Sequence, residues 1–124
     1  MISQESLQKY FESLDIVCKS ISKGGCIVMF PEGARTSDGQ LQEFKKGPFI
    51  LALRAQAIIV PITINGSFRI LKKGSLEISP GIINLVIHDP IFTEGINGIE
   101  RESHLRFYVR EKIKSAYIDQ SNEF

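Results

Sequence analysis

Residues 26–30 read CIVMF and residues 57–64 read AIIVPITI, and these two apolar runs decide the fold class of the chain. The first lies between a glycine pair and Pro31, which predicts a fully buried strand. The second is rich in β-branched residues, which favours a second strand. The segment between them is long enough for the crossover that parallel strands require. We therefore predict an α/β fold with a mostly parallel or mixed sheet flanked by helices.

Apolar residues outside these runs recur at helical spacing. One set near the N-terminus predicts an amphipathic helix that ends at Gly24 and Gly25. Its apolar positions are Leu7, Tyr10, Phe11, Leu14, Val17, Cys18 and Ile21. Pro48 predicts the start of a short helix that ends near Ala55. Residues 76–78 and 82–87 are predicted strands. A closing helix is marked by Leu105, Val109, Ile113 and Tyr117.

Length and composition indicate one domain over residues 1–124, of which 43% are hydrophobic and 23% charged. The formal net charge of +1 excludes a strong field that would attract nucleic acid, so any anion site must be local. The cysteines lack the paired spacing of a zinc site, and we expect no metal. The longest apolar run, residues 57–64, is far shorter than the roughly 20 residues that a membrane-spanning helix needs.

The segment that follows the first predicted strand carries the chemistry. Residues 30–47 read FPEGARTSDGQLQEFKKG and lie where α/β sheets bind their ligands, beyond the carboxyl end of a strand. Gly33 permits close backbone approach, Arg35 offers a planar fork of donors, and Lys45 and Lys46 add positive charge. The N-terminus of the next helix would add its dipole. These parts predict a phosphate site, although a surface turn with solvated charges remains the alternative.

The order of these motifs resembles the glycerolipid acyltransferases, specifically the lysophosphatidic acid acyltransferases. In that family FPEGTRS is followed by a glycine, a phenylalanine with KKG, a short helix and a VPV or VPI strand. This chain has FPEGART, Gly39, FKKG at residues 44–47, the helix, and VPI at residues 60–62. The departures are Ala34 in place of threonine and Thr36 in place of serine. The first helix and the HDPIF stretch also resemble family elements, so most of the chain is covered.

The resemblance implies an enzyme of phospholipid biosynthesis. It would move a fatty acyl group from acyl-CoA or acyl-carrier protein to the 2-hydroxyl of lysophosphatidate, with no cofactor besides this thioester co-substrate. The protein would be peripheral, on the cytoplasmic side of a membrane. The residues implied to hold the acceptor phosphate are Glu32, Gly33 and Arg35, with Lys45 and Lys46 assisting. The pocket would also include Pro31 and Pro61.

The family's reaction uses a histidine base within an HxxxxD motif, and this chain has none. His88 is followed five positions later by Thr93, and His104 by Val109, so we assign no catalytic residue. We expect an incomplete, C-terminal part of the domain that is inactive alone and has a separate N-terminal half as a candidate partner. A split or truncated gene and a start site assigned too late both explain this. The rival function is a noncatalytic anion-binding remnant or interaction module.

Overall fold

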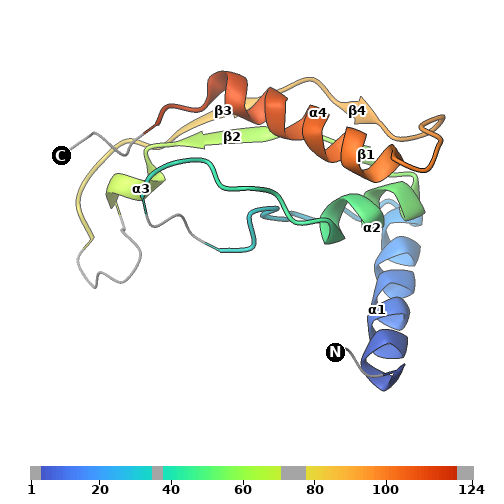
Figure 1. The fold of residues 1–124 in the computed structure, drawn as a ribbon. Helices are drawn as coiled ribbons and strands as arrows, with labels where there is room; N and C mark the ends of the chain where they lie inside the picture. The colour runs from blue at the N-terminus through green and yellow to red at the C-terminus, as the bar shows by residue number, and fades with distance from the viewer. Residues whose placement is uncertain (1–3, 35–37, 71–77, 120–124) are drawn as a thin grey trace.

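The computed structural model describes residues 4–34, 38–70 and 78–119. The helices are α1 (Gln4–Ser22), α2 (Gly47–Ala55), α3 (Ser67–Ile70) and α4 (Arg101–Ala116). The strands are β1 (Ile58–Ile59), β2 (Ile62–Asn65), β3 (Asn84–Ile87) and β4 (Ile91–Phe92). Figure 1 shows α4 lying across one face of the strands, with α2 below one end of them and α1 projecting away.

The predicted helices are confirmed. Helix α1 covers the predicted apolar positions and ends before Gly24, whose φ of 92° suits glycine. Half of its apolar side chains are exposed, and only Leu14 is buried. Arg54 ties α2 to α1 through a 2.8 Å ion pair with Asp15. Helix α2 ends at Ala55, as predicted, and Gln56 follows it in the left-handed conformation.

The strands form two antiparallel pairs, β1 with β4 and β2 with β3. The predicted strand of residues 57–64 is divided into β1 and β2 around Pro61, which has no N–H for a ladder. The predicted strand at residues 82–87 is confirmed in part by β3. Of the predicted strand at 76–78, residues 76 and 77 lie outside the described residues, and Ile78 is not in a strand.

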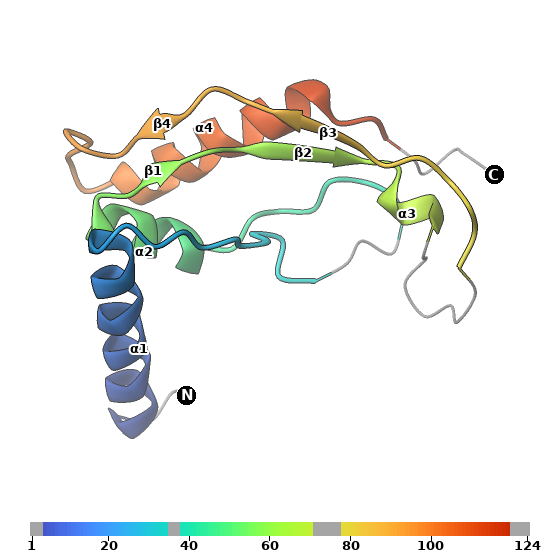
Figure 2. The same ribbon diagram turned by 180° about the vertical axis from the view of Figure 1, so that it is seen from behind.

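The prediction of a buried strand at residues 26–30 is wrong, and the parallel ladder expected with residues 57–64 does not form. The segment contains no strand residue, and the side chains of Val28 and Phe30 are 83% and 70% exposed. Its apolar sequence is suited to burial, but none of the described elements pairs with it. Figure 2 shows it as an extended segment that runs in the same direction as β1 and β2 without joining them.

The core lies between α2, α4 and the segment before α2. Four buried residues define it: Phe44, Phe49, Leu105 and Val109. The rings of Phe44 and Phe49 are stacked with centroids 6.1 Å apart. Ile59 and Ile91, from the paired strands β1 and β4, pack against this cluster and connect the sheet to it. Burial of side chains of this size stabilises the fold by about 1.5–3 kcal/mol each.

Polar side chains join β2 to the C-terminal part of α4. The Thr63 hydroxyl is fully buried and donates to the Ile113 carbonyl oxygen at 2.8 Å. The Asn65 amide donates to the Ala116 carbonyl at 2.9 Å, and its oxygen accepts the Ile118 N–H at 2.8 Å. The last carbonyls of a helix have no partner within the helix, so these bonds satisfy groups that burial would otherwise penalise.

Helix α4 also holds the 38–44 loop, which connects the predicted phosphate segment to α2. Arg110 donates from Nε to the Gln42 carbonyl at 3.2 Å and from Nη2 to the Leu41 carbonyl at 3.1 Å. The Tyr117 hydroxyl donates to the Gly39 carbonyl at 2.6 Å. A loop of polar and small residues therefore has a fixed path, because side chains far along the sequence bind its backbone.

We expect Arg110→Ala to lower the free energy of unfolding by about 1–3 kcal/mol, because it leaves two loop carbonyls without their charged donor. Urea unfolding measures this change. Hydrogen exchange should also quicken at the amides of residues 38–44. Glu111→Ala, at the exposed neighbouring position on α4, is the control and should change neither quantity. Unchanged exchange in the Arg110 variant would contradict the role of this side chain in holding the loop.

Candidate functional site

The structure brings three of the predicted site residues together. The Lys45 N–H donates to the Pro31 carbonyl at 2.7 Å, and the Gly33 N–H donates to the Phe30 carbonyl at 3.0 Å. A Cβ added at Gly33 would lie 3.5 Å from the side-chain carbons of Lys45. Gly33 has a φ of 76°, a conformation that favours glycine. Pro31, Gly33 and Lys45 thus form one local unit, whereas Arg35 lies outside the described residues.

Phe44 and the start of α2 set the position of the two lysines. Phe44 is buried in the core, and Lys45 and Lys46, directly after it, are exposed. The Lys46 carbonyl accepts the N–H groups of Phe49 and Ile50, both at 3.0 Å, so Lys46 is the N-cap of α2, which begins at Gly47. The two ammonium groups therefore extend from the positive end of a helix dipole. This combination of charges suits an anion, and the helix begins one residue before the predicted start at Pro48.

Glu32 makes a contact that sequence reasoning did not anticipate. Its Oε2 accepts the Gln42 N–H at 2.9 Å, so this carboxylate ties the segment after residue 30 to the 38–44 loop. Burial raises the pKa of Glu32 above its usual value, while the Gln42 hydrogen bond and the charge of Arg110 act in the opposite direction. A carboxylate repels a phosphate, so this geometry suits a positioning role. Direct contact of Glu32 with a phosphate stays a prediction.

Pro61 lies within the sheet. It is buried between β1 and β2, and its carbonyl accepts the His88 N–H at 2.9 Å. No hydrogen bond among the described residues connects it to residues 31–33 or to Lys45. The structure therefore ties Pro61 to the segment between β3 and β4, and its place in the pocket stays a prediction.

The two histidines have contacts of their own. His88 Nε2 lies 2.7 Å from the Thr63 hydroxyl. Since that hydroxyl uses its hydrogen for the Ile113 carbonyl, Nε2 of His88 must carry the proton and donate. His104 Nε2 forms a 3.3 Å ion pair with Glu100 on the exposed side of α4. Both arrangements are structural.

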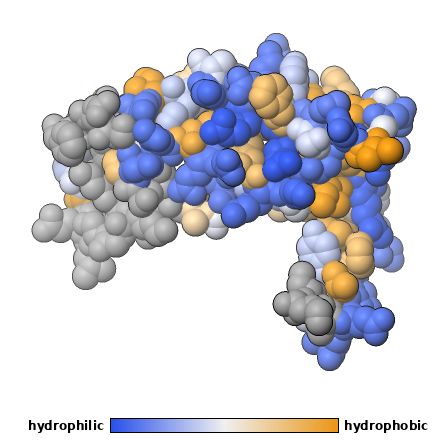
Figure 3. All heavy atoms as spheres, in the orientation of Figure 1, coloured by the Kyte–Doolittle hydropathy of each residue, from blue (hydrophilic) through white to orange (hydrophobic). Residues whose placement is uncertain are grey.

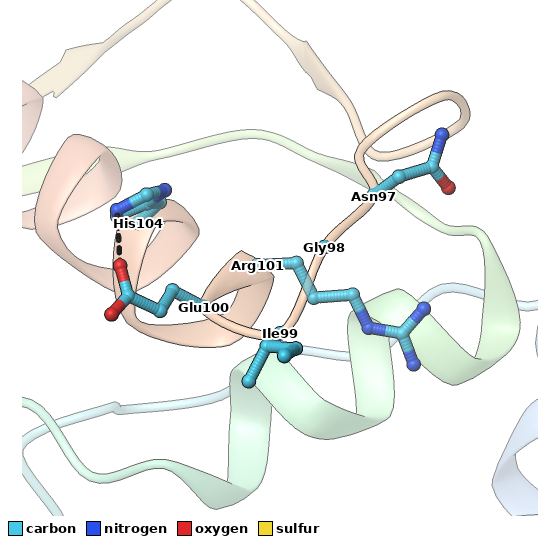
Figure 4. Close-up of a pocket in the computed structure, with 6 residues that line it drawn as sticks. All are labelled: Asn97, Gly98, Ile99, Glu100, Arg101 and His104. Carbon is cyan, nitrogen blue, oxygen red and sulfur yellow. Dashed lines mark ion pairs between the residues drawn. The ribbon is translucent and has the colours of Figure 1, made fainter.

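The described surface includes two depressions near the N- and C-terminal ends of α4. One, of about 580 Å³, surrounds the start of α4, where His104 and Glu100 face each other while Arg101 and Asn97 point away from them (Figure 4). None of its lining residues belongs to the phosphate segment. The other, of about 410 Å³, lies between the 38–44 loop and α4 and is lined by Gln40, Leu41, Arg110, Lys114, Tyr117 and Asp119. The smaller depression is therefore the one that adjoins the predicted site.

Sequence reasoning missed the residues of α4 that position the site. Arg106 donates to the Phe44 carbonyl at 3.4 Å, next to the bonds that Arg110 and Tyr117 make to the same loop. The sequence signal for Arg106 and Arg110 was their i, i+4 spacing on the predicted closing helix. Tyr117 was counted among the apolar positions of that helix, and in the structure it follows α4 in an extended conformation. That spacing alone does not name a partner 60 or more residues away, and the partners are backbone carbonyls, which leave no mark on the sequence.

Metal ligation and membrane crossing find no support in the described part of the chain. Within residues 4–34, 38–70 and 78–119, no cluster of three His, Cys, Asp or Glu side chains could hold a metal ion. The helices of these same ranges lack the combination of length and hydropathy needed to cross a bilayer.

The known proteins that are similar to this chain are acyltransferases, the family that the motifs indicate. The Acyltransferase family matches residues 1–65 of the 124, which is just over half of the chain. A chloroplastic 1-acyl-sn-glycerol-3-phosphate acyltransferase of Brassica napus is 41% identical over 73 residues, covering 58% of this chain and 21% of its own length. A 1-acyl-sn-glycerol-3-phosphate acyltransferase of Cocos nucifera is 33% identical over 113 residues, covering 90% of this chain and 35% of its own length.

The fold is shared with a solved enzyme. The crystal structure of the 1-acyl-sn-glycerophosphate acyltransferase PlsC from Thermotoga maritima superposes with a TM-score of 0.76 and 29% sequence identity. The match covers 90% of this chain and 45% of that chain, so this protein spans less than half of the solved enzyme. The likeness confirms the predicted acyltransferase-like α/β fold class. The chain belongs to the acyltransferase family, among the 1-acyl-sn-glycerol-3-phosphate acyltransferases.

Proposed function

We propose that this chain supplies the acceptor-phosphate site of an acyltransferase of phospholipid biosynthesis. The complete enzyme would move a fatty acyl group from acyl-CoA or acyl-carrier protein to the 2-hydroxyl of lysophosphatidate. Residues 1–124 contain no HxxxxD motif, so the histidine base and its aspartate would come from a part of the enzyme outside these residues. Assembly would take place at the cytoplasmic side of a membrane, with this protein bound peripherally.

One observation carries this proposal. Residues 31–33 and 45–46 are more than ten positions apart, yet the Lys45–Pro31 hydrogen bond of 2.7 Å places Gly33 against the Lys45 side chain beside the N-terminus of α2. A flexible glycine backbone, two ammonium groups and a helix N-terminus are the components of a phosphate site. A phosphate monoester carries a charge of about −1.5 to −2 at neutral pH, which suits this set of positive groups.

The residues of this chain would act by binding and orientation. Lys45 and Lys46 would neutralise the acceptor phosphate, and the fork of Arg35 would bind two of its oxygens, as the family resemblance implies. Glu32 would keep the 38–44 loop in place through the Gln42 N–H rather than contact the phosphate. Holding the phosphate fixes the distance from the 2-hydroxyl to the base, which is how positioning accelerates a reaction between bound groups.

The second candidate is a noncatalytic anion-binding module. Phosphate binding needs no base, so the groups of residues 31–33 and 45–46 would suffice for it. A mixing experiment distinguishes the two functions. An N-terminal half that carries HxxxxD, added to this chain, should restore acyl transfer to lysophosphatidate if the enzyme proposal holds. Binding of the acceptor without any transfer would favour the module.

In the reconstituted enzyme, we expect Arg35→Ala to raise the KM for lysophosphatidate at least about tenfold, because charged hydrogen bonds worth about 1.5–3 kcal/mol are lost. The KM for the acyl thioester should stay within about twofold of the starting value, since the donor does not use this site. Steady-state kinetics with each substrate varied in turn measures both. Lys23→Ala, an exposed lysine after α1, is the control. Equal damage to donor and acceptor use would reject the assignment of Arg35.

The pKa of Glu32 predicts a pH-dependent stability. Because its pKa is raised in the folded protein, ionising Glu32 costs stability as the pH rises from the unfolded value of 4.5 through the higher folded value. Glu32→Gln keeps an oxygen for the Gln42 N–H and removes the charge. We expect its Tm to exceed that of the unaltered protein at pH 7 and to differ little at pH 4.

Thermal unfolding at the two pH values measures this difference. Glu43→Gln, an exposed position in the same loop, is the control and should show no change that depends on pH in this way. A Glu32→Gln variant that is less stable than the unaltered protein at pH 7 would show that ionised Glu32 stabilises the loop, contrary to the effect of burial.

A further inference from the structure

Asparagine is followed by glycine at two positions of the chain, Asn65-Gly66 and Asn97-Gly98. In such a pair the backbone nitrogen of the glycine can attack the side-chain carbonyl carbon of the asparagine. Glycine favours this attack, because it has no side chain to obstruct the approach and its backbone adopts many conformations. The two pairs share this chemistry in the unfolded chain, so a difference between their reactivities in the native protein comes from the fold.

The fold opposes the reaction at Asn65. This residue is 5% exposed, its amide nitrogen donates to the Ala116 carbonyl at 2.9 Å, and its amide oxygen accepts the Ile118 N–H at 2.8 Å. A Cβ placed on Gly66 would collide with the Ile82 carbonyl oxygen, so the backbone is enclosed as well. The side chain of Asn65 therefore reaches the Gly66 nitrogen only when these contacts open.

Asn97 has the opposite surroundings. It belongs to the loop between β4 and α4, which Figure 1 shows at one end of the molecule, and both Asn97 and Gly98 are exposed. Its amide nitrogen donates to the Gly95 carbonyl at 3.2 Å, within the same exposed loop. This bond restrains the side chain little, because water competes for the donor and the acceptor. The carbonyl carbon of Asn97 is therefore accessible in the native protein.

The Gly98 nitrogen is available as the nucleophile. Its N–H donates no backbone hydrogen bond within the described part of the chain. A Cβ placed on Gly98 would meet no atom of the described residues within 4 Å beyond its neighbours in sequence. The surface over α4 in Figure 3 is mainly hydrophilic, so water reaches the loop that leads into this helix. Water and hydroxide can thus remove the proton from this nitrogen.

The charges around the loop favour the same reaction. Attack leaves negative charge first on the Gly98 nitrogen and then on the Asn97 side-chain oxygen. The N–H of Arg101 donates to the Gly98 carbonyl at 3.4 Å, so the positive end of the α4 dipole lies beside the reacting atoms. The Arg101 side chain lines the same depression. Glu100, the carboxylate of this depression, is paired with His104.

We propose that Asn97 is a site of spontaneous deamidation through a cyclic imide. The Gly98 nitrogen bonds to Cγ of Asn97, and the side-chain nitrogen leaves as ammonia with the proton that Gly98 loses. Water then opens the ring at either carbonyl and gives aspartate or isoaspartate at position 97. The reaction consumes no reagent besides water. It adds one negative charge before α4, which takes the formal net charge from +1 to zero.

The test compares the two pairs within the same molecule. The chain is incubated in mildly alkaline buffer, with and without enough urea to unfold it, and peptide mapping by mass spectrometry follows the conversion of each amide to a carboxyl group. Without urea, Asn97 should react at least about a hundredfold faster than Asn65, because Asn65 reacts only after local opening. In urea the two rates should agree within about threefold, since glycine follows both residues.

Asn97→Gln is the matched variant. Glutamine keeps the amide but places its carbonyl carbon further from the backbone, so the smaller imide ring of asparagine cannot form. Isoelectric focusing of the unaltered protein should show a more acidic form that accumulates as Asn97 reacts, and the variant should lose this fast conversion. Equal rates at the two asparagines without urea would overturn the proposal. So would an Asn97 rate that folding slows as strongly as that of Asn65, or an acidic form that accumulates equally fast in Asn97→Gln.

Discussion

The burial of Phe44 is the constraint on which the rest of the site depends. Its ring stacks on Phe49 of α2 and contacts the same cluster as Leu105 and Val109 of α4. Because Phe44 is fixed in the core, the next two residues must emerge at the surface as α2 begins. The positions of Lys45 and Lys46 are therefore set by the hydrophobic packing of Phe44 and Phe49 on either side of them. An anion site built in this way retains its geometry without a ligand.

The path of the 38–44 loop also depends on this core, through a side chain of α4 that contacts both. Arg110 lies 5.9 Å from the centre of the Phe44 ring while it donates to two loop carbonyls. Glu32 accepts from the same loop, so residues on both sides of it contribute to its path. A polar loop pays a large entropy cost when it is ordered, and charged hydrogen bonds from a packed helix offset part of it. Helix α4, which has no residue in the family's phosphate motif, thereby becomes part of the site.

The histidines illustrate how the structure separates a structural role from a chemical one. A histidine beside an aspartate at a strand end could suggest catalysis, yet His88 donates to a fully buried threonine whose own proton goes to Ile113. This chain of hydrogen bonds links the sheet to α4 and fixes the tautomer of the ring.

The sequence by itself determined helices α1, α2 and α4, the location of β2 and β3, and the family, and it predicts the phosphate segment, because apolar periodicity and the order of the FPEG, FKKG and VPI motifs are local features. Tertiary structure alone decided three matters. It placed Glu32 on the Gln42 N–H and the arginines of α4 on loop carbonyls, contacts between residues far apart in the chain. It left residues 26–30 exposed, because an apolar run becomes a buried strand only when neighbours pair with it and cover it. It also showed that one face of the sheet is covered and the other bare, since the sequence records a preference for burial and the packed layers decide whether it is met.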